Sequence, residues 1–289
     1  MTPTLHHSHL HRMPDGAQLA LHDWPLPAPA RRASVLLVHG LGEHALRYRA
    51  LAEQLNAWGL AVRGYDHYGH GQSSGPRGGL ARDDQLVEHL GTLIDTTRAG
   101  LAPGEPLVLL GHSMGGLVAA ALVARALRPV DALVLSSPAL ALRTSALQRL
   151  LLATLPALLP NLRIANGLDP DDLSHDAAQV AAYRADPINH DRLSARLARF
   201  LATEGARVMA QAPHWRVPTL LLWGEADRIV DPQGCARFAQ AAPQAVLTAR
   251  SFAGLYHELF READPAPALA ALRHWLRSRL AATPLKPVD

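Results

Sequence analysis

The sequence predicts an α/β fold, a mostly parallel, doubly wound sheet that carries an inserted helical cap. Two observations support this prediction. Short apolar runs alternate with longer stretches whose apolar residues recur at helical spacing, as in a sheet whose strands are joined by helices. This alternation stops between residues 139 and 215 and then resumes. The 289 residues therefore suit one large domain, with a first core part (1–138), a helical cap (139–215) and a second core part (216–289).

The first core part contains the expected strands and helices in alternation. Residues 17–24 follow an Asp15-Gly16 turn and alternate apolar with polar side chains, which is typical of a half-buried strand. Apolar runs typical of strands buried on both faces occupy residues 34–38, 60–65, 107–110 and 132–135. Helices are expected at residues 45–58, 83–98 and 117–127.

The segment 139–215 shows no convincing strand, and its Leu- and Arg-rich helical stretches are interrupted by prolines such as Pro156 and Pro187. Within it, Leu150 to Leu159 is apolar, but this stretch is far shorter than the roughly 20 residues that span a bilayer. We expect its apolar face to cover a pocket or to dip into a membrane interface. Beyond the cap, strands are expected at residues 219–223 and 245–252, and helices at residues 232–242 and 265–280.

Composition excludes several classes of protein. The 28 Lys and Arg residues nearly balance 25 Asp and Glu, and Arg is scattered along the chain, so nucleic acid is not an expected partner. One cysteine, Cys235, excludes an internal disulfide framework and a multi-thiolate metal site, and we expect a small buried side chain there. The first residues carry no apolar signal region, so the expected location is the cytoplasm.

Four histidines, His6, His7, His9 and His11, precede the first regular pattern. Such a tract could chelate a metal ion, but terminal residues commonly fray, and a tail offers no groups that would orient the ligands. We therefore expect a solvated tail, and the sequence predicts no metal ion and no cofactor.

The chain is organised around Gly111-His112-Ser113-Met114-Gly115, which separates a buried strand from a helix. A glycine two residues to either side of Ser113 lets the strand turn sharply into the helix, which leaves the serine strained and its Oγ exposed. The helix N-terminus supplies unpaired N–H groups and a positive dipole end where an oxyanion would develop. Although such strings also occur in ordinary loops, the strand-to-helix context indicates a nucleophilic serine.

A serine nucleophile needs an imidazole to accept its proton and a carboxylate to fix the tautomer of that imidazole. His112 is expected to point away from its neighbour Ser113, whereas His257 lies on a loop after the last strand. In this fold the acid lies between the serine and the histidine in the chain, which favours Asp227 and leaves Asp231 as the alternative. Loops at the carboxyl ends of predicted strands hold six of the sixteen histidines: His39, His44, His67, His70, His112 and His257.

Five motifs together resemble the monoacylglycerol lipase branch, also described as lysophospholipase-like, of the α/β-hydrolase family. They are His39-Gly40-Leu41-Gly42-Glu43-His44, the loop from Asp66 to Gly75, Gly111 to Gly116, Gly224 to Arg228, and Tyr256-His257. The resemblance covers almost the whole chain and is weakest in the cap, where Tyr183 to Ile188 matches.

This resemblance implies that Ser113 is the nucleophile, Asp227 the acid and His257 the base. It also implies an oxyanion hole formed by the backbone N–H groups of Leu41 and Met114, since the glycines beside Leu41 let that loop approach closely. The remaining residues of the family's pattern are expected to be structural: Glu43, His44, Arg47 and Tyr48.

We therefore expect a cofactor-free serine carboxylester hydrolase that cleaves acyl esters, foremost monoacylglycerols, through an acyl-enzyme. A lysophospholipase or a general short-chain esterase would use the same residues. A non-enzymatic ligand receptor is the alternative of a different class, but such proteins usually lack one member of the triad. The expected partner is a small lipid ester, with transient contact between the cap and a membrane surface. The sequence sets neither acyl chain length nor oligomeric state.

Overall fold

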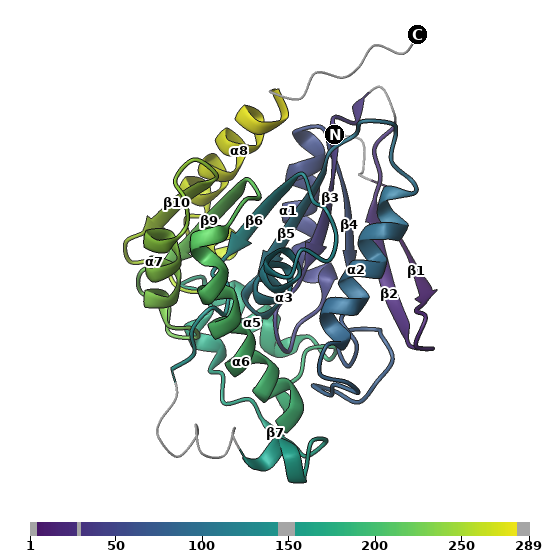
Figure 1. The fold of residues 1–289 in the computed structure, drawn as a ribbon, viewed down its shortest axis with the longest axis vertical. Helices are drawn as coiled ribbons and strands as arrows, with labels where there is room; N and C mark the ends of the chain where they lie inside the picture. The colour runs from purple at the N-terminus through teal and green to yellow at the C-terminus, as the bar shows by residue number, and fades with distance from the viewer. Residues whose placement is uncertain (1–4, 28–29, 144–153, 282–289) are drawn as a thin grey trace.

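An eight-stranded sheet forms the centre of the protein in a computed structural model, which describes residues 5–27, 30–143 and 154–281 (Figure 1). The strand order is β1-β2-β4-β3-β5-β6-β9-β10, in which β1, β2 and β4 pair antiparallel and all other neighbours pair parallel. The strands are β1 (His7–Arg12), β2 (Gln18–Trp24), β3 (Ala33–Val38), β4 (Leu60–Tyr65), β5 (Leu107–His112), β6 (Ala132–Ser136), β9 (Thr219–Gly224) and β10 (Leu247–Phe252). The predicted fold class is confirmed.

Helices cover both faces of this sheet, because successive side chains of a strand point to opposite sides. Leu36 and Val38 of β3 pack in one apolar layer with α2 (Gln85–Arg98), α3 (Ser113–Ala124) and α7 (Pro232–Ala241). Val35 and Leu37 face the other layer, formed with α1 (Arg49–Ala57) and α8 (Ala266–Ala281). The central strands are buried on both faces, which explains their continuous apolar runs.

The expectation of a frayed, solvated N-terminal tail is wrong for residues 7–12. These residues form β1, whose backbone pairs with β2 from His7↔Asp23 to Arg12↔Gln18. Nearly all side chains of β1 are exposed, so the strand carries no apolar pattern that the sequence could show. Backbone hydrogen bonds to the sheet edge order this segment instead.

Two predicted helices have different bounds in the structure. Residues 45–58 form a 3-10 helix (Ala45–Tyr48) followed by α1. The helix expected at residues 117–127 begins four residues earlier, at Ser113, and ends at Ala124.

The segment between β6 and β9 contains α5 (Ala177–Ala185) and α6 (Ala195–Gln211), together with short 3-10 turns at Pro170–Asp172 and Ala212–His214. The expectation that it holds no strand is wrong, since β7 (Arg163–Ala165) and β8 (Arg192–Ser194) form a small antiparallel sheet. Three residues leave too short a pattern for recognition. Leu150, Leu151 and Leu152 lie outside the described residues, and residues 154–158 are helical. Among the described residues, no helix has the length and apolar character needed to cross a membrane.

Candidate active site

Ser113 lies at the sharp turn between β5 and α3. Its φ is +53°, in the left-handed region that a non-glycine residue rarely adopts. The turn is tight enough that a Cβ at Gly115 would lie 2.2 Å from the Val38 carbonyl oxygen, and a Cβ at Gly111 2.6 Å from the Gly115 carbonyl oxygen. The two glycines therefore permit the close packing that holds Ser113 in its strained conformation, in which it lines two pockets.

Asp227 and His257 follow neighbouring strands, β9 and β10, and form a buried pair. Asp227 Oδ2 accepts a hydrogen bond of 2.7 Å from His257 Nδ1. The other carboxylate oxygen, Oδ1, accepts from the backbone N–H groups of Ile229 (2.8 Å) and Val230 (3.0 Å). These three bonds fix the carboxylate and, through it, the imidazole.

The pKa values of the two partners shift in opposite directions. Burial alone would lower the pKa of His257, but the adjacent Asp227 carboxylate outweighs burial and raises it above its ordinary value. Burial alone would raise the pKa of Asp227, but the charge of His257 and the hydrogen bonds to the carboxylate lower it. Asp227 is therefore ionised, and its negative charge favours the protonated form of His257.

Asp231, the alternative acid, occupies a different role. It is the N-cap of α7, where its Oδ1 accepts a hydrogen bond of 3.0 Å from the backbone N–H of Gln233. This contact satisfies one of the unpaired donors at the helix start.

The loop that carries Leu41 packs directly against Ser113. A Cβ at Gly40 would lie 3.2 Å from Ser113 Cβ, so the glycine permits this approach. Glu43 Oε1 accepts hydrogen bonds of 2.6 Å from the Gly40 N–H and from the Tyr48 hydroxyl, which hold the loop in place. Leu41 and Met114 line one of the two pockets together with Ser113.

A buried ionic network lies beside the serine. Arg47 donates to Glu43 and to both carboxylate oxygens of Glu258, at 2.7 and 3.0 Å, and its guanidinium stacks 4.6 Å from the Tyr183 ring centre. Burial alone would raise the pKa of Glu43, but the charge of Arg47 keeps it well below the ordinary value. The four side chains line a pocket of about 20 Å³ with Ser113 and His257. Glu43 and Arg47, expected to be structural, therefore also line the site.

A second, apolar cavity of about 280 Å³ is also lined by Ser113. Its volume is close to the lower end of the range for ligand sites, about 300–1,000 Å³. Polar groups in its wall are few, among them Arg143 and Asn166. The apolar lining comes mainly from the segment between β6 and β9 and from the loop after β9: Leu142, Leu155, Leu162, Ile164, Leu168, Leu193, Leu201, Ile229 and Val230.

The other candidate histidines lie in different surroundings. His39, His67 and His70 pack against one another, with ring centres 4.6 to 6.1 Å apart, and burial lowers the pKa of all three. His44 Nε2 lies 2.8 Å from Asp186 Oδ2, a contact that joins the loop after β3 to the residues following α5.

His112, expected to point away from Ser113, lies beside the His257 ring. Its ring lines the small pocket with Ser113 and lies 4.7 Å from the His257 ring. Burial, followed by the charge of His257, lowers the pKa of His112 to about 3, so the ring is neutral.

The chain is similar to known proteins in family, in sequence and in fold. A family model described as "Serine aminopeptidase, S33" matches residues 29–264. The chain is 34% identical to the monoacylglycerol lipase of Mycolicibacterium smegmatis, over 92% of this chain and 95% of that protein. It is 32% identical to the monoglyceride lipase of Rattus norvegicus, over 92% of this chain and 89% of that protein. The solved structure of Paleococcus ferrophilus monoacylglycerol lipase superposes with a TM-score of 0.81 at 35% identity, over 90% of this chain and 99% of that one.

The chain belongs to the monoacylglycerol lipase-like α/β-hydrolases. It is a serine ester hydrolase. In this hydrolase, sequence reasoning missed Tyr183 and Glu258 as pocket residues. Glu258 directly follows His257, and this adjacency was the available signal. Tyr183 opens the stretch Tyr183 to Ile188, the part of the cap that resembles the family, but nothing in this resemblance places it beside Ser113.

Proposed function

We propose that the protein hydrolyses monoacylglycerols with Ser113 as nucleophile, His257 as general base and Asp227 as the acid that orients His257. Ser113 Oγ attacks the ester carbonyl while His257 Nε2 accepts its proton, and Asp227 stabilises the resulting imidazolium. The backbone N–H groups of Leu41 and Met114 bind the oxyanion. His257 then donates the proton to the departing alcohol oxygen, which leaves an acyl-enzyme at Ser113. A water molecule, activated by His257, releases the fatty acid.

The observation that carries this proposal is the meeting of two unlike pockets at Ser113. The apolar cavity suits an acyl chain, whose burial is favourable by about 0.8 kcal/mol per CH₂. The small pocket is lined by Glu43, Glu258 and Tyr183, whose carboxylates accept, and whose hydroxyl both donates and accepts, hydrogen bonds of the kind that a glycerol head makes. The two carboxylates of Glu43 and Glu258 outnumber the one guanidinium of Arg47 in this pocket, and their net negative charge disfavours an anionic phosphate head.

A comparison of esters with one acyl chain and different heads tests the choice of substrate. We expect a higher kcat/KM for 1-lauroylglycerol than for ethyl laurate and for lauroyl lysophosphatidylcholine. Tyr183→Phe retains the ring over Arg47 and removes only the hydroxyl, so it should reduce the preference for the glycerol ester and leave ethyl laurate hydrolysis unchanged. Equal rates on the first two esters, or faster hydrolysis of the lysophospholipid, would contradict the proposal.

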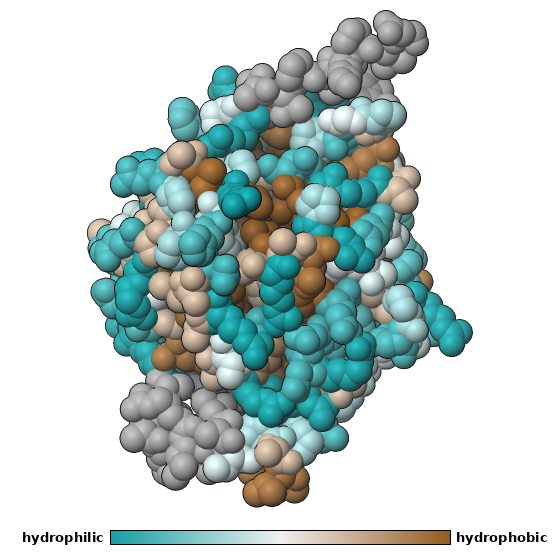
Figure 2. All heavy atoms as spheres, viewed as in Figure 1, coloured by the Kyte–Doolittle hydropathy of each residue, from teal (hydrophilic) through white to brown (hydrophobic). Residues whose placement is uncertain are grey.

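We also propose that residues 139–215 act as a cap that receives substrate from a lipid surface. Leu162 and Ile164 line the apolar cavity and are also 43% and 55% exposed, so they lie at its opening. Leu158 and Leu159 nearby are more than half exposed. Figure 2 shows apolar side chains that project at the bottom of the view. Such exposed apolar groups around a cavity support transient contact with a membrane surface. A cytoplasmic location remains the expectation from the sequence.

A further inference from the structure

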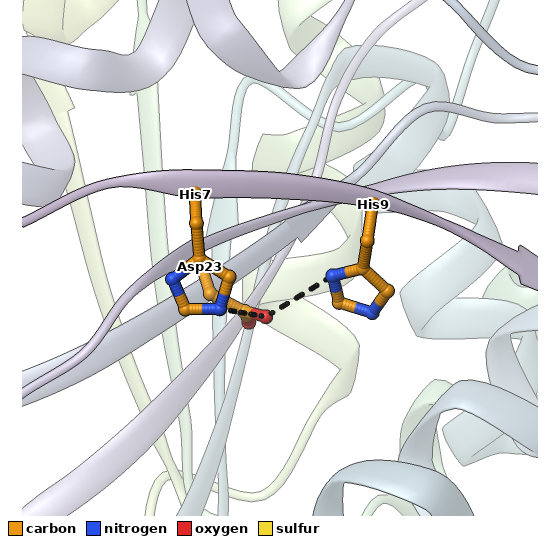
Figure 3. A group of neighbouring side chains, drawn as sticks. All are labelled: His7, His9 and Asp23. Atoms are coloured by element: carbon orange, nitrogen blue, oxygen red, sulfur yellow. Dashed lines mark ion pairs between the residues drawn. The ribbon is translucent and has the colours of Figure 1, made fainter.

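The sheet edge formed by β1 and β2 carries a cluster of metal-ligating side chains that the reaction does not use. His7 and His9 alternate with Ser8 along β1, so both imidazoles point to the same face of the strand. Asp23 of β2 is the direct cross-strand partner of His7, and its carboxylate lies on that face too (Figure 3). This group lies outside residues 29–264, the part of the chain that the family model matches.

The spacing of the ligand atoms is close to that of a metal site. Asp23 Oδ2 lies 3.4 Å from His7 Nε2 and 3.8 Å from His9 Nδ1, and the three atoms all lie within 4.8 Å of one another. Ligand atoms at about 2.0–2.2 Å from a tetrahedral zinc ion lie about 3.4 Å apart. Small rotations of the two imidazoles would therefore complete three corners of a tetrahedron, and water would supply the fourth.

The carboxylate in this cluster is already oriented. Arg63 of β4 donates from Nε to Asp23 Oδ1 at 2.6 Å and from Nη2 to Oδ2 at 3.2 Å. The Asp23 side chain is only 11% exposed, whereas His7 and His9 are 59% and 45% exposed. The site thus has one fixed ligand and two accessible imidazoles, with an open path for an ion from solvent. The positive charge of Arg63 opposes a dication, so we expect micromolar rather than nanomolar affinity.

We propose that His7, His9 and Asp23 bind one divalent transition-metal ion, such as Zn²⁺, that ties β1 to β2. Two imidazoles and one carboxylate are a donor set that zinc accepts, and this set favours zinc, nickel or copper over magnesium or calcium. Because β1 pairs with the rest of the sheet along one side only, a metal ion that bridges the two strands would stabilise it in the folded state.

Calorimetric titration of the untagged protein with ZnCl₂ tests this proposal. We expect one zinc ion per chain and a dissociation constant in the micromolar range. His7→Gln, His9→Gln and Asp23→Asn should each weaken binding at least about tenfold, since each removes one of three protein ligands. At the same zinc concentration, the rise in Tm should be larger for the wild type than for His7→Gln.

His11→Gln is the matched control, because His11 lies on the same face of β1 but pairs with Leu19 rather than with a carboxylate. It should bind zinc like the wild type. Thermal unfolding without metal verifies that each variant folds. The absence of saturable binding would overturn the proposal. So would binding that survives the His7, His9 and Asp23 substitutions, or a loss in His11→Gln as large as in His7→Gln.

Discussion

Replacement of Asp227 by Asn should nearly abolish turnover while leaving the fold intact. The hydrogen bonds of Asp227 give the physical reason for the expected loss. Asp227 Oδ1 accepts from two backbone N–H groups, so the side-chain oxygen of Asn must take that position. The Asn NH₂ group then faces His257 Nδ1, where the carboxylate now accepts a hydrogen bond of 2.7 Å. An NH₂ donor requires Nδ1 to be the acceptor, which places the proton on Nε2.

A His257 protonated on Nε2 cannot accept the proton of Ser113. In serine proteases this wrong tautomer lowers kcat by about 10⁴, which corresponds to about 5.4 kcal/mol at 1.36 kcal/mol per tenfold change. We expect a loss of 10³ to 10⁴ here, also because the imidazolium loses its counter-ion. The assay is steady-state hydrolysis of p-nitrophenyl butyrate, combined with thermal unfolding of each variant.

Asp231→Asn is the matched control for this prediction. Asp231 caps α7, and Asn is as good an N-cap as Asp, so both stability and kcat should change little. Two results would refute the reasoning: a kcat for Asp227→Asn within tenfold of the wild type, or a loss in Asp231→Asn comparable to that in Asp227→Asn.

Three further predictions follow from the site. A fluorophosphonate probe should label the wild type but not Ser113→Ala, and labelling of Ser113→Ala would exclude this serine as the nucleophile. Cys235→Ala, which changes a buried free thiol, should keep full activity. The base must be neutral to accept a proton, so kcat/KM should fall as pH decreases through the raised pKa of His257, with the midpoint of this fall above about 6.5; a midpoint well below 6.5 in a pH profile would contradict the assignment. Leu162→Glu, at the opening of the apolar cavity, should lower kcat/KM for long-chain esters and leave kcat/KM for acetyl esters unchanged. The control is Leu127→Glu, at a similarly exposed leucine outside both pockets, which should change neither value. Equal losses on all chain lengths, or a fall in Tm that accounts for the losses, would assign Leu162 a packing role.

The sequence by itself determined the fold class and the order of the central strands and helices along the chain. Strands buried on both faces leave continuous apolar runs, as at β3 and β5, and such runs can be read without knowledge of partners. The turn at Ser113 can also be predicted from the sequence alone, because a Cβ at either flanking glycine would clash with nearby backbone. Asp227 and His257 can be predicted as site residues, because parallel strands bring their carboxyl ends to one edge of the sheet.

Tertiary structure alone decided the features that depend on long-range contact. β1 forms because its backbone pairs with β2, although its exposed side chains show no strand pattern. The His112 ring turns into the pocket, and Tyr183 reaches Arg47 across 136 residues of chain, through packing that no local spacing encodes. The Asp23 carboxylate meets His7 and His9 for the same reason, because the register of two strands, and not the composition of either, determines which side chains face one another.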